Sequence, residues 1–380
     1  MRKGKKKYEL RNVFQGVVHR EVKTGFGSYV LKTDTLMQST RLIFEKKSKF
    51  DTAFEGKAVE NLYFCSQINR NLLKYLIMNK TTQLVFVTIA LVCVGCSQQF
   101  WDNLKMINDG YQNAFTYQGA LEKKYAANGS YQVESYSLAD NDEKIKSHDI
   151  YYPTVLKTST KKWPLVVIAN GTGMPAKFYP AIFKHLASWG FIVVGNQEEW
   201  TWEGKSVSKS QEVVIAEGKN PKSPLYNKVD TEHIGLVGHS QGGMAVYTAA
   251  SRFSNSHRYK ALCTQSGTAV MLADSLGWDF LKGVKAPMLM MGGCGGVDAN
   301  ALSKLDDMVK SYNAIGSKQK VLGRIKNTDH GDMLKRGDAY MTAWMRYWLC
   351  GDKEAAKCFI GTSAEILSNG SWQDVRRTGL

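Results

Sequence analysis

From about residue 130 onward, short apolar segments alternate with longer segments in which apolar residues recur at helical spacing. The apolar segments have the length of strands and are rich in Val, Ile and Leu, which is typical of strands that are buried on both faces. This alternation predicts a mostly parallel sheet with helices on both faces. Eight strands are predicted, at Val133–Leu138, Asp149–Tyr152, Leu165–Ala169, Phe191–Gly195, Ile234–Gly238, Ala261–Thr264, Met288–Met291 and Lys320–Ile325.

The first two of these strands are predicted to form an antiparallel hairpin, and helices are predicted between the later ones. No large cap domain is expected, because only 23 residues separate Cys263 from Pro287, enough for a loop and one short helix. The connection between residues 195 and 233 is longer, but it must contain a helix around residues 210–216. The clearest helices are predicted at Ala176–Ser188, Gly242–Arg252, Leu302–Asn313 and Asp338–Leu349.

Composition and charge narrow the class of protein. Hydrophobic residues make up 43% of the 380 residues and charged residues 22%, which excludes wholesale disorder, collagen-like repeats and a disulfide-dense mini-protein. The net charge of +16 suggests a nucleic-acid partner, but most of the excess charge lies near the N-terminus. Residues 1–77 hold 16 Lys and Arg against 7 acids, whereas residues 96–380 hold 33 Lys and Arg against 27 acids. The later region has no zinc-finger spacing, RNA-binding motif or basic helix, so a nucleic-acid partner is not expected.

An apolar run of 11 residues at 84–94 indicates an export signal, since it is too short to span a bilayer. Met78 and Lys80 precede the run, and Gly95 and Cys96 follow it. The segment 78–95 resembles a bacterial lipoprotein signal, in which the Cys is lipidated and becomes the new N-terminus, although Cys93 stands where such signals usually carry Leu. We therefore expect an exported protein, anchored to the membrane of a bacterial cell envelope through a lipid on Cys96. The alternatives are cleavage nearby with secretion, or a retained signal anchor.

Residues 1–77 form an extension whose role the sequence does not define. The segment begins with a basic run at residues 2–7 and shows no sustained helical or strand period. One interpretation is that translation starts at Met78, and the other is a cytoplasmic tail before a signal anchor. Residues 96–129 are interpreted as a tether and lead-in, and residues 130–380 as the domain that carries the chemistry.

The strongest motif is Gly-His-Ser-Gln-Gly at residues 238–242, where a predicted strand ends and a predicted helix begins. A serine in a tight strand-to-helix turn needs glycines at Gly238 and Gly242, because Cβ atoms there would collide as the helix folds back. Ser240 would project its hydroxyl above the sheet, next to the positive end of the helix. This arrangement predicts a nucleophile rather than an ordinary glycine-rich turn.

A serine nucleophile needs a base, and His330 is the only histidine after residue 257. It directly follows the last predicted strand, whereas His239, His233 and His185 suit structural roles. A carboxylate must orient the imidazole, and Asp298 follows the preceding strand after a glycine-rich stretch, 32 residues before His330. The competing carboxylates, on a helix surface or too close in sequence to the histidine, are Asp306, Asp307, Asp329 and Asp332.

The oxyanion hole needs two backbone N–H groups. Gln241, the residue after the nucleophile, supplies one, and Thr172 in the loop after the third strand supplies the other. A helix-capping turn is the alternative for this loop, and the two roles are compatible. Trp200 and Trp202 follow the fourth strand and could stack on an aromatic or sugar substrate or pack against the next helix.

Residues 163–351 resemble the serine α/β-hydrolases of the cutinase, polyester-hydrolase and chlorophyllase-like group. The resemblance rests on Asn-Gly-Thr-Gly at 170–173, Gly-His-Ser-Gln-Gly-Gly at 238–243, a late Asp and Asp-His-Gly-Asp-Met at 329–333. Dienelactone hydrolases share the architecture but use Cys in place of Ser240. The resemblance implies an α/β-hydrolase fold with eight strands, and a carboxylic ester hydrolase that needs no metal or cofactor.

Other functions of the same fold stay open. An acyltransferase or a peptidase would use the same acyl-enzyme, and an inactive fold could serve as a binding module. An uncovered site would admit bulky or polymeric esters. The sequence does not define the acyl or alcohol part of the substrate, or the oligomeric state.

Four cysteines follow Cys96, an even number that favours disulfides in an oxidising compartment. Cys350 and Cys358 are close in sequence, and Cys263 and Cys294 follow strands that are expected to be neighbours. Two disulfides in this pairing are predicted, with buried free thiols as the alternative.

Overall fold

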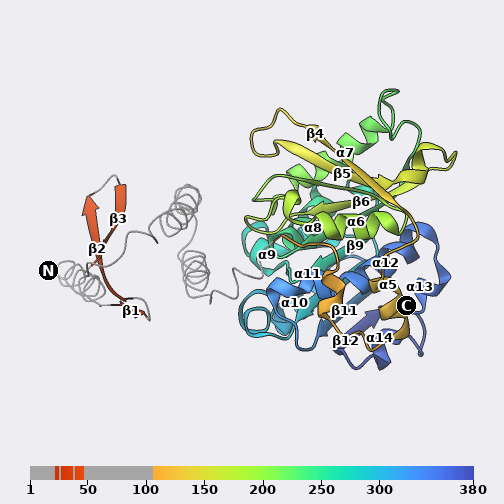
Figure 1. The fold of residues 1–380 in the computed structure, drawn as a ribbon. Coiled ribbons are helices and arrows are strands. Elements are labelled where there is room, and N and C mark those ends of the chain that lie inside the picture. The colour runs from red at the N-terminus through yellow and green to blue at the C-terminus, as the bar shows by residue number, and fades with distance from the viewer. Residues whose placement is uncertain (1–21, 25–26, 37–38, 47–105) are drawn as a thin grey trace. The chain divides into compact units, whose positions relative to one another are not determined.

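The computed structural model describes residues 22–24, 27–36, 39–46 and 106–380 (Figure 1). The chain divides into two compact units, Met1–Gly95 and Cys96–Leu380. The apolar run at 84–94 and Cys96 lie outside the described residues. Within the described part of the chain, no helix has the length and apolar character needed to cross a membrane.

The first unit contains an antiparallel sheet, in the order β1-β2-β3, formed by β1 (Val22–Thr24), β2 (Gly27–Leu36) and β3 (Ser39–Lys46). The sequence analysis found no strand period here. Backbone pairing across a short turn can form such a sheet without the strict alternation of apolar and polar residues that a half-buried strand shows.

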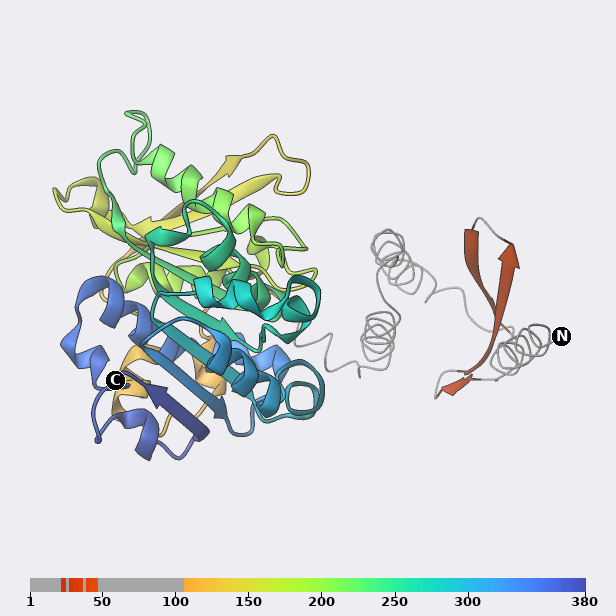
Figure 2. The same cartoon turned by 180° about the vertical axis from the view of Figure 1, so that it is seen from behind.

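The second unit contains a mixed sheet of nine strands in the order β12-β11-β10-β9-β8-β6-β7-β5-β4 (Figures 1 and 2). Strands β6 to β11 run parallel to one another, whereas β4, β5 and β12 pair antiparallel with their neighbours. All eight predicted strands are present. Their observed bounds are β4 (Val133–Ala139), β5 (Ser147–Pro153), β6 (Trp163–Ala169), β7 (Ile192–Asn196), β8 (Val229–His239), β9 (Tyr259–Gln265), β10 (Met288–Gly293) and β11 (Lys320–Ile325).

The ninth strand, β12 (Trp372–Thr378), was missed by the sequence analysis, which predicted eight. It pairs antiparallel with β11 at the edge of the sheet, and its register slips between Leu322 and Arg324. Its sequence, WQDVRRT, is mostly polar and charged. Edge strands often carry charge, which prevents further pairing, so the apolar signal that reveals buried strands is absent here.

Helices cover both faces of the sheet, so that each face packs against its own core. Helix α12, together with α6 and α5, packs on one face around Phe183 and Trp344, and α7, α8 and α10 pack on the other around Leu236 and Tyr247. The bounds are α5 (Ala120–Ala126), α6 (Pro180–Ser188), α7 (Lys205–Glu217), α8 (Gln241–Arg252), α9 (Val270–Leu276), α10 (Leu305–Ala314), α11 (Met333–Arg336), α12 (Asp338–Cys350), α13 (Lys353–Ala356) and α14 (Glu365–Ser368).

The stretch interpreted as a tether contributes to this core from residue 107 onward. Ile107, Tyr111 and Tyr125 are buried in the core beneath α12. Figure 1 shows α5 beside α12 and α13, although more than 200 residues separate them in the sequence. Buried Glu122 of α5 pairs with Arg336 at 2.5 Å, which joins the lead-in to the C-terminal helices.

The two predicted disulfides are wrong: Cys263, Cys294, Cys350 and Cys358 are free thiols. Cys263 pairs in register with Leu289, so Cys294 lies five residues further on, roughly 16 Å along the strand direction, well beyond bridging distance. Cys350 is exposed at the end of α12, whereas Cys358 is buried in the core, so the two side chains occupy different environments.

Candidate active site

Ser240 occupies a strained turn between β8 and α8. Its backbone has φ 58° and ψ −123°, a conformation that L-residues rarely adopt. Glycines make the turn sterically feasible: a Cβ at Gly238 would lie 2.0 Å from the carbonyl oxygen of Gly242, and a Cβ at Gly242 would lie 2.0 Å from that of Ala169. The predicted need for glycine at both positions therefore agrees with the packing of the turn.

The structure brings Ser240, His330 and Asp298 together in one hydrogen-bonded chain. Nε2 of His330 lies 2.8 Å from Oγ of Ser240, and Nδ1 of His330 lies 2.7 Å from Oδ1 of Asp298. Ser240 follows β8, Asp298 follows β10 and His330 follows β11, three parallel strands whose carboxyl ends meet at one edge of the sheet. The competing acids Asp306 and Asp332 do not contact the imidazole.

Hydrogen bonds define the tautomer of His330. An ionised carboxylate only accepts hydrogen bonds, so Nδ1 of His330 carries the proton that it donates to Asp298. Nε2 then has a free lone pair toward the Ser240 hydroxyl. This is the arrangement in which the imidazole can take a proton from the serine.

Asp298 is fully buried and kept ionised by its neighbours. Burial by itself would raise the pKa of this carboxyl, but the adjacent His330 and hydrogen bonds from Ser266 and Gly293 lower the pKa below its ordinary value. The Gly293 N–H donates to Oδ2 at 2.7 Å, and the Ser266 hydroxyl donates to the same oxygen. One oxygen of Asp298 is thus held by the protein, and the other faces the imidazole.

His239, the residue before the nucleophile, packs against His330 and binds its backbone. Its buried ring lies 4.9 Å from the ring of His330, between centroids, and its Nε2–H donates to the His330 carbonyl at 2.9 Å. Burial and the neighbouring imidazole lower the pKa of His239 to about 4. His239 therefore stays neutral at neutral pH, which suits the structural role that the sequence analysis gave it.

The two residues assigned to the oxyanion hole lie side by side. The Gln241 side chain donates from Nε2 to Oγ1 of Thr172 at 3.3 Å, and its Oε1 accepts from the Thr201 N–H at 2.7 Å. Within the described residues, neither the Gln241 N–H nor the Thr172 N–H donates a hydrogen bond. Both donors are therefore free for a bound oxyanion. The neighbouring Gly171 N–H donates to the Tyr179 hydroxyl at 3.1 Å.

Sequence reasoning missed the supporting roles of three side chains in the site. Ser266 donates to Asp298, Asp329 accepts backbone N–H groups around the acid, and the amide of Gln241 braces the Thr172 loop. Ser266 directly follows β9, the one strand between β8 and β10, so its place after a central strand was the available signal. The other two contacts depend on loop conformations that no spacing rule reveals.

Within residues 106–380, no cap domain is inserted between the strands that carry the site. Between β9 and β10 the chain forms only α9 and one short 3₁₀ turn, η5 (Trp278–Gly283). Between β7 and β8 it forms α7 and a loop. Trp200 is 36% exposed on this second connection, whereas Trp202 packs against the core.

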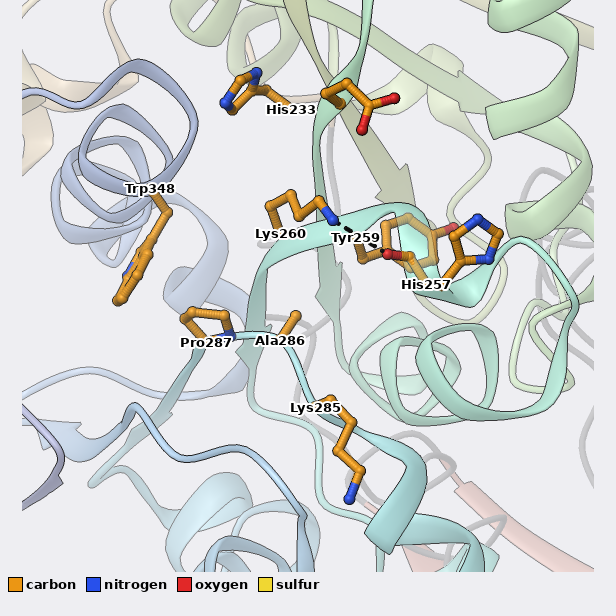
Figure 3. A pocket seen from close by; sticks show the side chains of 9 residues that line it. His233, His257, Tyr259, Lys260, Lys285, Ala286, Pro287 and Trp348 are labelled. Atoms are coloured by element: carbon orange, nitrogen blue, oxygen red, sulfur yellow. Dashed lines mark hydrogen bonds between the residues drawn. The ribbon is translucent and has the colours of Figure 1, made fainter.

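A separate cavity of about 470 Å³ lies at the opposite edge of the sheet. Figure 3 shows its lining side chains, with Trp348 on α12 and Lys260 at the start of β9. Because Ser240 follows the carboxyl end of β8, the cavity at the amino ends of β8, β9 and β10 is far from the hydrogen-bonded chain. Among the described residues, no group of three His, Cys, Asp or Glu side chains could hold a metal ion.

A serine on a strained strand-to-helix turn, joined to a histidine and a buried aspartate at the carboxyl edge of a mostly parallel sheet, is typical of the α/β-hydrolase fold. The chain belongs to the PET hydrolase-like family, whose model matches residues 118–376. The match includes Ser240, Asp298 and His330, and also Thr172 and Gln241, the two residues that the sequence analysis assigned to an oxyanion hole.

Part of the chain is similar to two curated chlorophyllases. Chlorophyllase type 0 of Chenopodium album is 26% identical over 136 residues, which is 32% of this chain and 39% of the relative. Chlorophyllase-1, chloroplastic, of Citrus unshiu is 27% identical over 109 residues, which is 27% of this chain and 33% of the relative. The matched regions thus span between a third and two fifths of the length of these proteins.

Proposed function

We propose that this protein is a serine hydrolase that cleaves carboxylic esters through an acyl-enzyme. The observation that carries the proposal is the hydrogen-bonded chain from Oγ of Ser240 through His330 to Asp298, with Ser240 on a strained strand-to-helix turn that is typical of α/β-hydrolase nucleophiles. Membership of the PET hydrolase-like family and the similarity to chlorophyllases support ester cleavage.

In the first half of the reaction, Oγ of Ser240 attacks the carbonyl carbon of the ester. The Ser240 proton passes to Nε2 of His330, and Asp298 stabilises the imidazolium through Nδ1–H. The oxyanion of the tetrahedral intermediate accepts hydrogen bonds from the N–H groups of Gln241 and Thr172. When the intermediate collapses, the bond to the alkoxy oxygen breaks and the alcohol leaves with the proton from His330.

In the second half, water replaces the alcohol. His330 takes a proton from water as the oxygen attacks the acyl carbon, and the second tetrahedral intermediate uses the same two N–H donors. Its collapse breaks the bond to Oγ of Ser240, which regains the proton from His330. The products are the free acid and the unchanged enzyme.

The substrate we propose is an ester with a short acyl group, on an alcohol part that can be bulky or polymeric. The connection after β9 forms only α9 and a short 3₁₀ turn, and the longer connection after β7 forms α7 and a loop. Neither connection forms a cap domain, so the site is expected to be open to large molecules. The exposed indole of Trp200 offers an aromatic surface next to Thr201, whose N–H contacts Gln241. An acyltransferase or a peptidase with the same three residues is the main alternative, because both proceed through the same acyl-enzyme.

A fluorophosphonate probe tests the nucleophile directly. We expect one modified peptide, the one that contains Ser240, and loss of both labelling and hydrolysis of p-nitrophenyl acetate in Ser240→Ala. Wild-type labelling at another serine, or more than a tenth of the activity in Ser240→Ala, would contradict the proposal. Ser251→Ala, near the C-terminal end of α8, where the hydroxyl donates to the Tyr247 carbonyl, is the matched control and should keep both.

We also propose export to the cell envelope with a lipid anchor on Cys96, which rests on the short apolar run at 84–94 and the cysteine that follows it. Cys96→Ala should move the protein from the membrane fraction to the soluble one. Mass spectrometry of the mature protein should show an acylated Cys96 as the first residue. Peptides from residues 1–77 in the host protein would favour a signal anchor instead.

A further inference from the structure

A second carboxylate, that of Asp329, lies beside the His330–Asp298 pair without contacting the imidazole. Its Oδ1 accepts the N–H of Val297 at 3.1 Å, of Asp298 at 3.0 Å and of His330 at 2.8 Å. Its Oδ2 also accepts from Val297 at 3.2 Å. One side chain therefore binds the backbone of the acid and the backbone of the base at the same time.

These contacts matter because the two residues come from separate loops. Asp298 begins a π-helical turn, η6 (Asp298–Leu302), five residues after β10 ends, and His330 lies five residues after β11 ends. The loops are also joined upstream, where Cys294 and Gly295 both donate to the Thr328 carbonyl at 2.9 and 2.8 Å. The hydrogen bonds of Asp329 continue this connection between the two loops as far as Asp298 and His330.

Gly295 allows the carboxylate to come this close. A Cβ on Gly295 would lie 2.3 Å from Cβ and 2.4 Å from Cγ of Asp329, so any larger residue would push the carboxylate away. The next residue, Gly296, differs: an added Cβ would meet only Nδ2 of Asn300, at 4.0 Å. Neither glycine has a positive φ, so alanine at either position is limited by space alone.

We infer that Asp329 is a positioning residue for the proposed reaction. It fixes Asp298 relative to His330, and so keeps Nδ1–H of His330 directed at the Asp298 carboxylate. Asp329 touches no reacting atom, and its effect passes through the backbone of the two residues that it binds. This inference rests on the proposed function, since it concerns the distance between the acid and the base.

Three variants of the full chain test this role. Asp329→Ala removes the acceptor, and Gly295→Ala displaces it without changing its charge. Each should lower kcat for p-nitrophenyl acetate by about 10²-fold, the cost of a misplacement near 1 Å, and leave KM within about twofold. Asp329→Asn keeps one oxygen in place and should recover about a tenth of the wild-type kcat.

The low-field proton NMR signal of the His330 Nδ1–H separates positioning from mere stability. We expect it to weaken or disappear in folded Asp329→Ala and Gly295→Ala, because its acceptor has moved. Asp332→Ala, three residues further along the same turn, and Gly296→Ala are matched controls that should keep both signal and rate. An unchanged signal and kcat in folded Gly295→Ala and Asp329→Asn would overturn the inference even if Asp329→Ala fails to fold.

Failure of this inference is distinguishable from failure of the proposed function. If Ser240→Ala is inactive and the Asp329 and Gly295 variants keep their rate, only the role of Asp329 is wrong. If Ser240→Ala keeps its activity, the proposed function is wrong.

Discussion

The environment of Asp298 predicts what replacement of this residue by asparagine should do. Oδ1 of Asp298 faces Nδ1 of His330, and Oδ2 faces two donors, Gly293 N–H and the Ser266 hydroxyl. In Asp298→Asn, one oxygen becomes an NH₂ group, which can only donate. The new amide therefore has two possible orientations, with its NH₂ group either toward Gly293 and Ser266 or toward His330. In each orientation the NH₂ group faces a group that also donates.

The two orientations differ in cost. With NH₂ toward Gly293, a rigid backbone N–H loses its partner in the buried interior, which costs about 1–3 kcal/mol. With NH₂ toward His330, the imidazole can adapt by carrying its proton on Nε2 instead of Nδ1. The second orientation is favoured, and it leaves no lone pair on Nε2 to accept the Ser240 proton.

The expected loss in kcat is therefore about 10⁴-fold, the size of effect that a wrong tautomer causes in a Ser-His-Asp site, equivalent to about 5 kcal/mol of transition-state stabilisation. Stopped-flow and steady-state hydrolysis of p-nitrophenyl acetate measure it, with thermal unfolding as the check on folding. Asp306→Asn, an exposed carboxylate on the first turn of α10, is the control and should be nearly silent. The reasoning is refuted if folded Asp298→Asn keeps more than a tenth of the wild-type kcat.

Three further predictions concern the turn, the pH dependence and the substrate. Gly238→Ala should destabilise folding by roughly 3 kcal/mol or more in chemical denaturation, because its Cβ meets the Gly242 backbone at 2.0 Å. Asp140 is half-buried. Desolvation would raise its pKa, but Lys209, the Asp142 N–H and His148 lower the pKa to about 2. Asp140→Asn should therefore cost about 1 kcal/mol of unfolding free energy at neutral pH, because solvent screens part of these interactions, and this difference should shrink as pH falls from about 4 to about 2. Aryl acetates and butyrates should show a higher kcat/KM than palmitates without activation at a lipid interface, because an open cleft buries few acyl CH₂ groups, each worth about 0.8 kcal/mol; a rate that rises only above the solubility limit of a long-chain ester would contradict this.

The sequence predicted the central strands because each is an apolar run that both faces of the sheet bury. Strand β12, at the edge, carries Arg376 and Arg377 and gives no such signal. The lead-in from residue 107 was also missed as part of the core. Its anchors, Ile107, Tyr111 and Tyr125, are scattered through polar sequence and become buried only when α12 packs against them.

The hydrogen-bonded chain was predicted more fully than its supports. Chain order and position after strands were enough to select Ser240, Asp298 and His330, because the fold places the carboxyl ends of its parallel strands together. Spacing could not reveal that the Asp329 carboxylate accepts the backbone N–H groups of Val297 and Asp298 instead of pairing with the imidazole of His330. The predicted disulfide of Cys263 failed for a related reason, since neighbouring strands do not imply neighbouring residues.

Backbone hydrogen bonds join the residues just after one strand to the end of the neighbouring strand or to the loop that follows it. These bonds explain how segments that are distant in the sequence meet at one site. The Ser240 N–H donates to the Gln265 carbonyl at 2.8 Å, and the Ser266 N–H donates to the Met291 carbonyl at 2.8 Å. The Cys294 N–H donates to Thr328 at 2.9 Å in the same way. Four residues of the site thus each follow a strand whose position its neighbour fixes, from β8 through β9 and β10 to β11: Ser240, Ser266, Asp298 and His330. The register of the strands sets these positions. Substitutions on the outer faces of the helices should therefore leave the Ser240–His330–Asp298 geometry intact, whereas substitutions in the loops after β8, β9, β10 and β11 should disturb it.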